Sequence, residues 1–211
     1  MSARITSRAF LACAAALVAA PASLAGYTIT QGASAPQYTD FTLNFDEPGT
    51  PTGGVGPDFW AVSHGLTLDS GVGGGGQVAD FDPGWGLGDG QSWLGPFGAF
   101  MTFDTDLTGM SLEVWDPSGP PTPFGGGLGV FIFNDGVEVG SLFVEPAWGG
   151  LGDTWFNIVG DGGDVFDEVR ILGFGFPADT YIDNLSWNVV PGPGALALFG
   201  VAGLARRRRR A

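Results

Sequence analysis

The stretch LGVFIFNDGVEVG, residues 128–140, contains the clearest local structure in this sequence. Val130 and Ile132 lie two residues apart in a short apolar run, as expected for a β-strand with one buried face. The run ends at Asn-Asp-Gly, residues 134–136, a tripeptide that tolerates the positive φ angles of a tight hairpin turn. The stretch therefore predicts two antiparallel strands joined by a short turn.

Similar short strands are predicted on both sides of this hairpin, because apolar residues recur there with a period of two. They lie at Phe41, Leu43 and Phe45, at Met101 and Phe103, at Leu112 and Val114, at Val169 and Ile171 around Arg170, and at Tyr181, Leu185 and Trp187. Clusters of Gly, Pro, Asp and Asn separate these runs, and no run of about ten residues or more has the 3.6-residue period of a helix. We therefore predict an all-β domain, a jelly roll or β-sandwich of about ten strands.

The part of the chain between its two ends is strongly acidic. The sequence holds 22 Asp plus Glu, all of them between residues 26 and 190, where Arg170 is the only cation, so the formal charge of this part is −21. A surface of this sign repels phosphate backbones, which excludes nucleic acid as a partner, and it attracts divalent cations. The 38 Gly and 15 Pro imply many turns, while 17 Phe and 7 Trp argue against disorder.

The first 25 residues have the pattern of a cleaved secretory signal peptide. Arg4 and Arg8 form a positive segment, residues 9–20 are uncharged, and Ser23-Leu24-Ala25 supplies the small residues that signal peptidase reads. A retained membrane anchor is the alternative, but a helix over residues 9–20 rises only about 18 Å against a hydrocarbon core of about 30 Å. The single cysteine lies in this segment, so the exported product would have no disulfide.

A second unusual segment is VVPGPGALALFGVAGLARRRRRA, residues 189–211. A Pro-Gly-Pro motif is followed by small or apolar residues at 194–205 and then by consecutive arginines at 206–210. We predict a short hydrophobic helix over residues 194–205, which is marginal in length for a bilayer crossing. The arginines would stop transfer and stay on the cytoplasmic side while the acidic domain lies outside.

This segment resembles the PEP-CTERM sorting domain, also called the ice-binding protein C-terminal domain. The family's Val-Pro-Glu-Pro type motif is matched, with Gly in place of the usual Glu, by Val190, Pro191, Gly192 and Pro193. The family's terminal basic cluster is matched by Arg206, Arg207, Arg208, Arg209 and Arg210. The resemblance implies export, transient anchoring in the inner membrane, and cleavage near the motif by an exosortase, a membrane-embedded cysteine transpeptidase, in bacteria that make exopolysaccharide. A permanent tail anchor is the alternative.

These patterns divide the chain into a signal peptide (1–25), an acidic β-sandwich domain (26–188) and a PEP-CTERM-like sorting signal (189–211). The domain has little of what catalysis requires. His64 is the only histidine, which we interpret as a turn or strand-edge residue, and no G-x-S-x-G nucleophile elbow occurs. A glycoside hydrolase needs only two carboxylates, but among 22 acids the presence of two is no evidence. We therefore expect a protein that is not an enzyme.

A structural calcium ion is the one cofactor that the acids suggest, since calcium takes oxygen ligands from flexible loops. Asp46 and Glu47 follow a predicted strand, and Asp183 lies in YIDNLSW, residues 181–187. The latter pattern resembles the closing strand of exported PEP-CTERM proteins and of jelly-roll carbohydrate-binding modules, in which a calcium often joins the first and last strands. The resemblance implies that Asp46 or Glu47 binds calcium together with Asp183. Solvated turn acids are the alternative.

The seven tryptophans raise the question of sugar stacking. Trp60, Trp85, Trp93 and Trp148 lie in Gly- and Pro-rich regions that read as loops, whereas the other three lie in strand-like runs. We take Trp85 and Trp93 as candidate ligand-binding residues, with ordinary loop packing as the alternative. The expected protein is thus secreted or displayed at the cell surface, with a structural or adhesive role near exopolysaccharide. A carbohydrate-binding module, and after it a glycoside hydrolase, are the alternatives.

Overall fold

A computed structural model describes residues 22–24, 26–81, 90–115, 127–144, 154–173 and 179–191. These residues form thirteen strands and one four-residue helix. The two helices predicted at the ends of the chain lie outside the described residues. Within the described ranges, no helix is long and apolar enough to span a bilayer.

The elements follow one another along the chain, with the helix between the fourth and fifth strands. They are β1 (Ala22–Leu24), β2 (Tyr27–Gly32), β3 (Phe41–Leu43), β4 (Gly53–Val55), α1 (Ala61–His64), β5 (Leu66–Ser70), β6 (Gly76–Ala79) and β7 (Ser92–Pro96). The longer strands come next: β8 (Ala99–Trp115), β9 (Leu128–Asn134), β10 (Val137–Val144), β11 (Trp155–Gly160), β12 (Phe166–Gly173) and β13 (Asp179–Val189).

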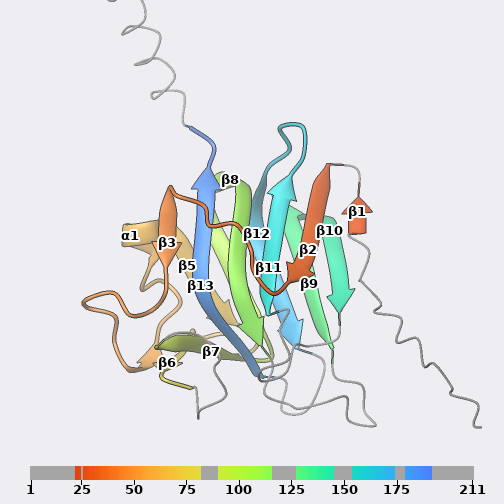
Figure 1. The fold of residues 1–211 in the computed structure, drawn as a ribbon. Coiled ribbons are helices and arrows are strands. Elements are labelled where there is room, and N and C mark those ends of the chain that lie inside the picture. The colour runs from red at the N-terminus through yellow and green to blue at the C-terminus, as the bar shows by residue number, and fades with distance from the viewer. Residues whose placement is uncertain are drawn as a thin grey trace, which may run out of the picture.

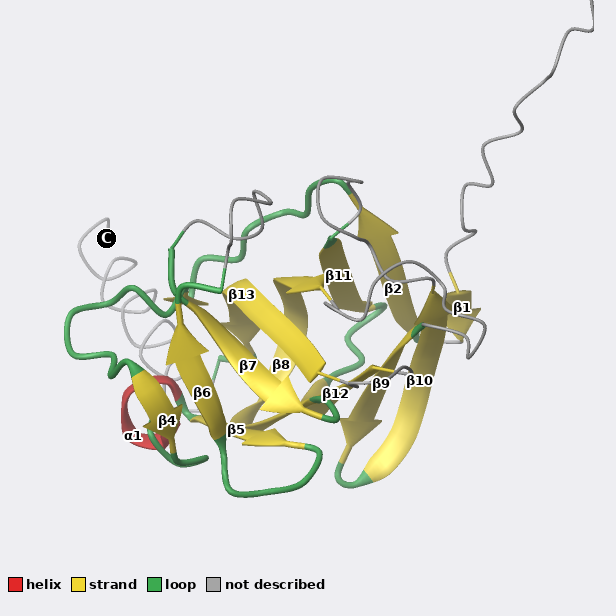
Figure 2. Ribbon diagram, turned by 90° about the horizontal axis from the view of Figure 1, so that it is seen from below, coloured by secondary structure: helices red, strands yellow, loops and turns green. Residues whose placement is uncertain are grey.

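The strands form an antiparallel sandwich of two layers, which the 17-residue strand β8 joins (Figures 1 and 2). Residues 99–103 of β8 pair with β5 and β12, and β9 and β10 continue that first layer. Residues 109–115 of β8 pair with β11 and β13 in the second layer, which extends through β2 to β1. On its other side β13 pairs with β3 and β7, followed by β6 and β4. The predicted all-β sandwich is confirmed.

The predicted hairpin at residues 134–136 is also confirmed. Asn134 pairs with Val137 across the turn between β9 and β10. Asp135 has φ 50° and Gly136 has φ 74°, the two positive angles that this turn requires.

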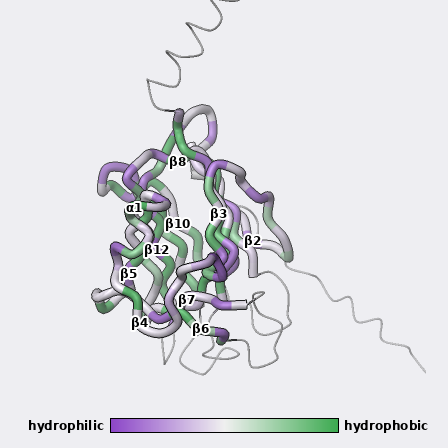
Figure 3. Tube along the Cα trace, turned by 90° about the vertical axis from the view of Figure 1, so that its left-hand side faces the viewer, coloured by the Kyte–Doolittle hydropathy of each residue, from purple (hydrophilic) through white to green (hydrophobic). Residues whose placement is uncertain are grey.

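The core lies between the layers and is built by the inward residues of each strand. Val130, Ile132, Val169 and Ile171 supply it from the first layer, and Leu112, Val114, Ile182, Leu185 and Trp187 from the second. Hydrophobic residues follow the strands and hydrophilic ones gather in the connecting turns (Figure 3). Burial of this apolar surface is the main term that stabilises the fold.

The last strand departs from the expected period of two. Ile182, Leu185 and Trp187 are buried in the core, whereas Tyr181 is only half-buried and stacks against Trp115. A bulge between residues 183 and 186, with Asn184 at φ 50°, shifts the alternation by one residue. The predicted shared face of Tyr181 and Leu185 is therefore wrong.

The sheet also extends into the segment predicted as a signal peptide. Ala22 pairs with Ile29 and Leu24 pairs with Tyr27, so β1 is an edge strand of the second layer. Cleavage after Ala25 would remove this strand.

Candidate functional site

The predicted sorting motif begins at the point where β13 ends. Val189 N–H donates to Asp40 Oδ2 at 3.0 Å, and Val190 N–H donates to the carbonyl oxygen of Asp106 at 2.9 Å. The first motif residue is thus attached to the domain by its backbone. Gly192, Pro193 and the arginines 206–210 lie outside the described residues.

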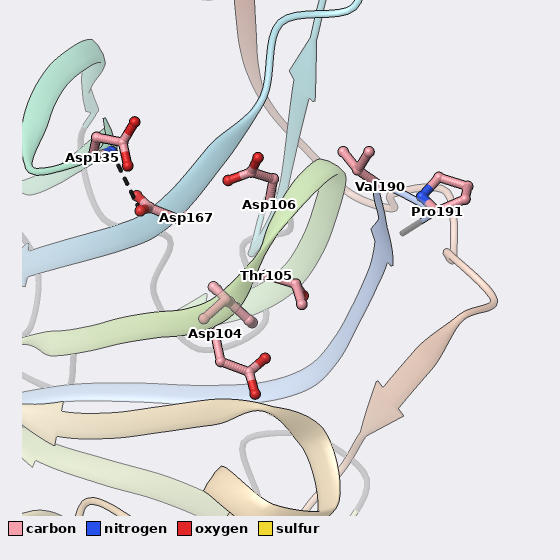
Figure 4. A pocket seen from close by; sticks show the side chains of 8 residues that line it. Asp104, Thr105, Asp106, Asp135, Asp167, Val190 and Pro191 are labelled. Carbon is pink, nitrogen blue, oxygen red and sulfur yellow. Dashed lines mark hydrogen bonds between the residues drawn. The ribbon is translucent and has the colours of Figure 1, made fainter. Parts of the chain in front are cut away.

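A pocket of about 420 Å³ lies beside the start of the motif (Figure 4). It is lined by Phe103, Asp104, Thr105, Asp106, Asp135, Asp167, Val190 and Pro191, and we call it the acidic pocket. Three of its acids come from strands β8 and β12, and the fourth from the β9–β10 turn. The hairpin predicted from the sequence therefore delivers one acid to this site.

In the described part of the chain, none of the four acids of the pocket forms a salt bridge. Asp167 Oδ2 accepts a hydrogen bond from Asp135 N–H at 3.3 Å, while Asp167 Oδ1 is buried without a partner among the described residues. The negative charge also acts on Tyr27. Burial raises the pKa of its phenol, and the carboxylates of Asp164 and Asp106 raise this pKa further. This end of the sandwich is consequently a region of concentrated negative potential.

A second hollow of about 270 Å³ adjoins the acidic pocket and shares Asp104 and Thr105 with it. His64, at the end of α1, lies in its wall, and His64 Nδ1 forms a hydrogen bond with Ser63 Oγ at 2.8 Å. The imidazole also packs near the rings of Phe41 and Trp187, at 6.4 and 6.1 Å between centroids. No described carboxylate hydrogen-bonds to His64, so the third member of a catalytic triad is lacking among the described residues.

The three predicted calcium ligands are not brought together as a set. Asp46 is exposed and accepts from Gln91 N–H at 3.0 Å, and Glu47 Oε1 accepts from Asn44 N–H at 2.8 Å. Asp183 is fully buried and accepts from the neighbouring Asn184 N–H at 2.7 Å. In the described ranges, no three His, Cys, Asp or Glu side chains could hold one ion. Glu47 Oε2, however, is buried without a partner in the same ranges.

The structure places Asp183 beside an acid that the sequence did not single out. Glu113 of β8 is directly opposite Asp183 of β13, and only 9% of Glu113 is exposed. Glu113 accepts hydrogen bonds from Thr154 Oγ1 at 2.9 Å and from Asn184 Nδ2 at 3.2 Å. In the sequence Glu113 stands between two apolar residues, which reads as an outward, solvated position. Its pairing with Asp183 depends on the register between β8 and β13, and this register cannot be predicted from the residues around Glu113.

The tryptophans do not form the predicted platform within the described residues. Trp93 lies in β7 rather than in a loop and is completely buried, because its ring packs over Gly76 and Gly95, where a side chain would collide with it. Trp93 is therefore wrong as a sugar-stacking residue. Trp60, also assigned to a loop, is 2% exposed. Trp85 and Trp148 lie outside the described residues.

No family model and no curated protein matches this chain. Among solved structures, it is similar to a family 43 arabinoxylan arabinofuranohydrolase from Bacillus subtilis in complex with cellotetraose, with a TM-score of 0.33 and 16% identity over 56% of this chain. It is also similar to a structure of promiscuous carbohydrate-binding modules from the β-sandwich superfamily, with a TM-score of 0.33 and 16% identity over 66% of this chain. The chain spans 25% of the first structure and 64% of the second, and the likeness concerns the β architecture alone.

Proposed function

We propose that this chain is an exported bacterial protein of the cell surface or extracellular matrix, and that residues 189–211 are a sorting signal processed by an exosortase-type transpeptidase. The observation that supports this most directly is the position of the motif. Val190 hydrogen-bonds to the domain and Pro191 borders the acidic pocket, so the motif starts where the described sandwich ends. An enzyme at the inner membrane could therefore reach the motif without unfolding the core.

The charge distribution supports the same route. The acidic domain and the arginines 206–210 have opposite signs and are separated by the apolar residues 194–205. A chain of this pattern would stay in the inner membrane with its arginines inside until cleavage releases the domain. The partners in this proposal are the processing enzyme, the membrane for a limited time, and exopolysaccharide after release.

Mass spectrometry of the protein from culture medium and cell surface tests this proposal. We expect the recovered protein to lack the arginines 206–210 and to end near residues 190–193. Replacing Pro191 and Pro193 with Ala should leave the full tail on the membrane-bound protein. Recovery of the mature protein with all five arginines would show a permanent anchor instead.

For the domain we propose a structural or adhesive role without catalysis. The surroundings of His64 support this, because among the described residues its ring hydrogen-bonds to Ser63 and packs near the rings of Phe41 and Trp187. The carboxylate pair of Glu113 and Asp183 is the place to test for hydrolysis. Turnover of any polysaccharide that Glu113→Gln abolishes would replace this proposal with a glycoside hydrolase.

We also retain one calcium ion as a proposal. Its support is Glu47 Oε2, which is buried and has no partner among the described residues. A hard cation would satisfy this oxygen, with backbone carbonyls as the further ligands that calcium accepts.

A further inference from the structure

The outward face of the first layer carries aromatic side chains where a solvated sheet normally carries polar ones. Residues directly opposite each other in antiparallel strands share a face. Arg170 of β12 is opposite Phe100 of β8 on one side and Phe131 of β9 on the other, and the inward neighbours of Arg170, Val169 and Ile171, are fully buried. Arg170, Phe100 and Phe131 therefore point away from the core.

The adjacent positions extend this surface. Glu168 is opposite Phe133 of β9, and Gly129 is opposite Phe143 of β10. Strands β12, β9 and β10 lie side by side in the lower part of Figure 2, and β12 pairs with residues 99–102 of β8. We call the surface formed by Phe100, Phe131, Phe133, Phe143 and Arg170 the aromatic face.

Arg170 lies at the centre of the aromatic face. Its guanidinium carbon is 4.2 Å from the ring centroid of Phe133 and 5.4 Å from that of Phe100, and its Nε donates to Glu168 Oε1 at 2.5 Å. The side chain is 38% exposed, and its terminal nitrogens make no hydrogen bond to a described residue. A guanidinium within reach of two rings keeps its remaining N–H donors available for the oxygens of a ligand.

Phe143 supplies an exposed ring beside this cation. It is 64% exposed, and its ring meets that of Phe131 edge-on at 5.3 Å. The residue directly opposite Phe143 is Gly129, which has no side chain, so the neighbouring β9 ring is that of Phe131. Phe143 is exposed and Phe100, Phe131 and Phe133 are half-buried, so together they offer an apolar surface on which another molecule can pack.

The negative charge of the domain indicates which class of ligand the aromatic face could bind. Residues 26–190 carry 22 acids against Arg170, so an anionic polymer or a second copy of this chain would be repelled. Glu168 is paired with Arg170, and two further acids lie directly opposite rings of the aromatic face: Asp69 of β5 opposite Phe100, and Glu138 of β10 opposite Phe133. A polymer without charge avoids this repulsion.

We propose that the aromatic face binds an uncharged polysaccharide chain. The apolar faces of its sugar rings would pack on Phe143 and Phe131, and its hydroxyl oxygens would accept hydrogen bonds from the terminal nitrogens of Arg170. This inference rests on the proposed adhesive role and names its ligand class. In this proposal the aromatic residues that contact the sugar are Phe131 of β9 and Phe143 of β10, and not Trp85 and Trp93 as expected from the sequence.

Affinity electrophoresis in native gels tests this proposal with the full chain, purified in a detergent that has no sugar headgroup. The gels contain hydroxyethylcellulose, dextran or arabinoxylan as uncharged probes, and polygalacturonate as an anionic one. We expect slower migration in at least one uncharged gel and unchanged migration in polygalacturonate. Phe143→Ala and Arg170→Gln should each weaken the retarding interaction about tenfold or more.

Phe97→Ala is the matched control, because Phe97 is a similarly exposed phenylalanine, at 52%, that lies in the β7–β8 turn and is not one of the residues of the aromatic face. It should leave the retardation unchanged, and circular dichroism confirms the fold of each variant. The proposal is overturned if no uncharged gel retards the chain, or if both variants are retarded as strongly as the original. A dimer in sedimentation that Phe143→Ala dissociates would assign the face to self-association instead. Tail processing is read by mass spectrometry, so the sorting proposal can fail while this one holds.

Discussion

The aromatic face and the acidic pocket are built by the same strands and have opposite character. On β8, Phe100 belongs to the aromatic face and Asp104 to the acidic pocket, and on β12 Arg170 and Asp167 are divided in the same way. The difference is position along the strand. On β8 Phe100 lies near the start of the strand and the acids Asp104 and Asp106 near its middle, while on β12 Asp167 lies near the start and Arg170 near the middle. A single layer thereby has an aromatic region with one cation and a separate acidic region.

The largest effect on stability is expected when a carboxylate, the side chain typical of the acidic pocket, is placed in the aromatic face. Phe133→Asp removes the ring beneath the Arg170 guanidinium and places a carboxylate directly opposite Glu168. We expect the free energy of unfolding to fall by about 2–3 kcal/mol, from lost apolar contact, a lost cation–π contact and like-charge repulsion. Urea unfolding measures it. The control Phe133→Leu should lose less than half as much, and equal losses would show that the carboxylate introduced opposite Glu168 adds no repulsion.

A smaller effect of opposite sign is expected in the acidic pocket. Asp167→Asn removes one of four clustered charges and keeps an oxygen that can accept from Asp135 N–H. We expect unfolding in low salt to cost about 0.5 kcal/mol more than in the original protein, and this gain should vanish in about 1 M NaCl, where charges are screened within about 3 Å. Asp58→Asn, at an exposed turn, is the control. A gain that persists in high salt would contradict the electrostatic origin.

Calcium should act outside both regions, at Glu47. An ion on the buried Oε2 would raise the thermal unfolding midpoint of the protein, by the equivalent of about 0.4 kcal/mol when calcium equals its dissociation constant. Glu47→Gln should remove the difference between EDTA and millimolar calcium. Identical melting curves of the original protein in the two buffers would eliminate the ion.

The smallest effect concerns Asp179, at the start of β13, whose carboxyl pKa burial raises above its ordinary value. The folded state then holds this proton more tightly than the unfolded state does. The resulting stability is complete below the unfolded pKa, about 3.9, and is lost as the pH rises through the folded value. Asp179→Asn should therefore show less loss of stability than the original protein between pH 3 and pH 7. Parallel pH profiles in urea unfolding would contradict this.

How far the sequence predicted the molecule depended on whether the signal was local. The β9–β10 hairpin was predicted correctly, since its turn residues decide the turn by their own backbone preferences. Trp93 was assigned to a loop because glycines surround it, yet those glycines are what make room for its ring inside the sandwich. The bulge at Asn184 and the pairing of Asp183 with Glu113 left no local signal, because both depend on the register between distant strands.

The sequence by itself determined the all-β class, the −21 charge of residues 26–190 and the motif that resembles a sorting signal. Only the tertiary structure decided which rings lie inside. The run Val130-Phe131-Ile132-Phe133 is apolar at every position, so alternation along the strand favours neither face. Pairing of β9 with β12 and packing against the second layer turned Val130 and Ile132 into the core and left Phe131 and Phe133 outside. A β-strand buries one side only, and which side faces the core is settled by its neighbours.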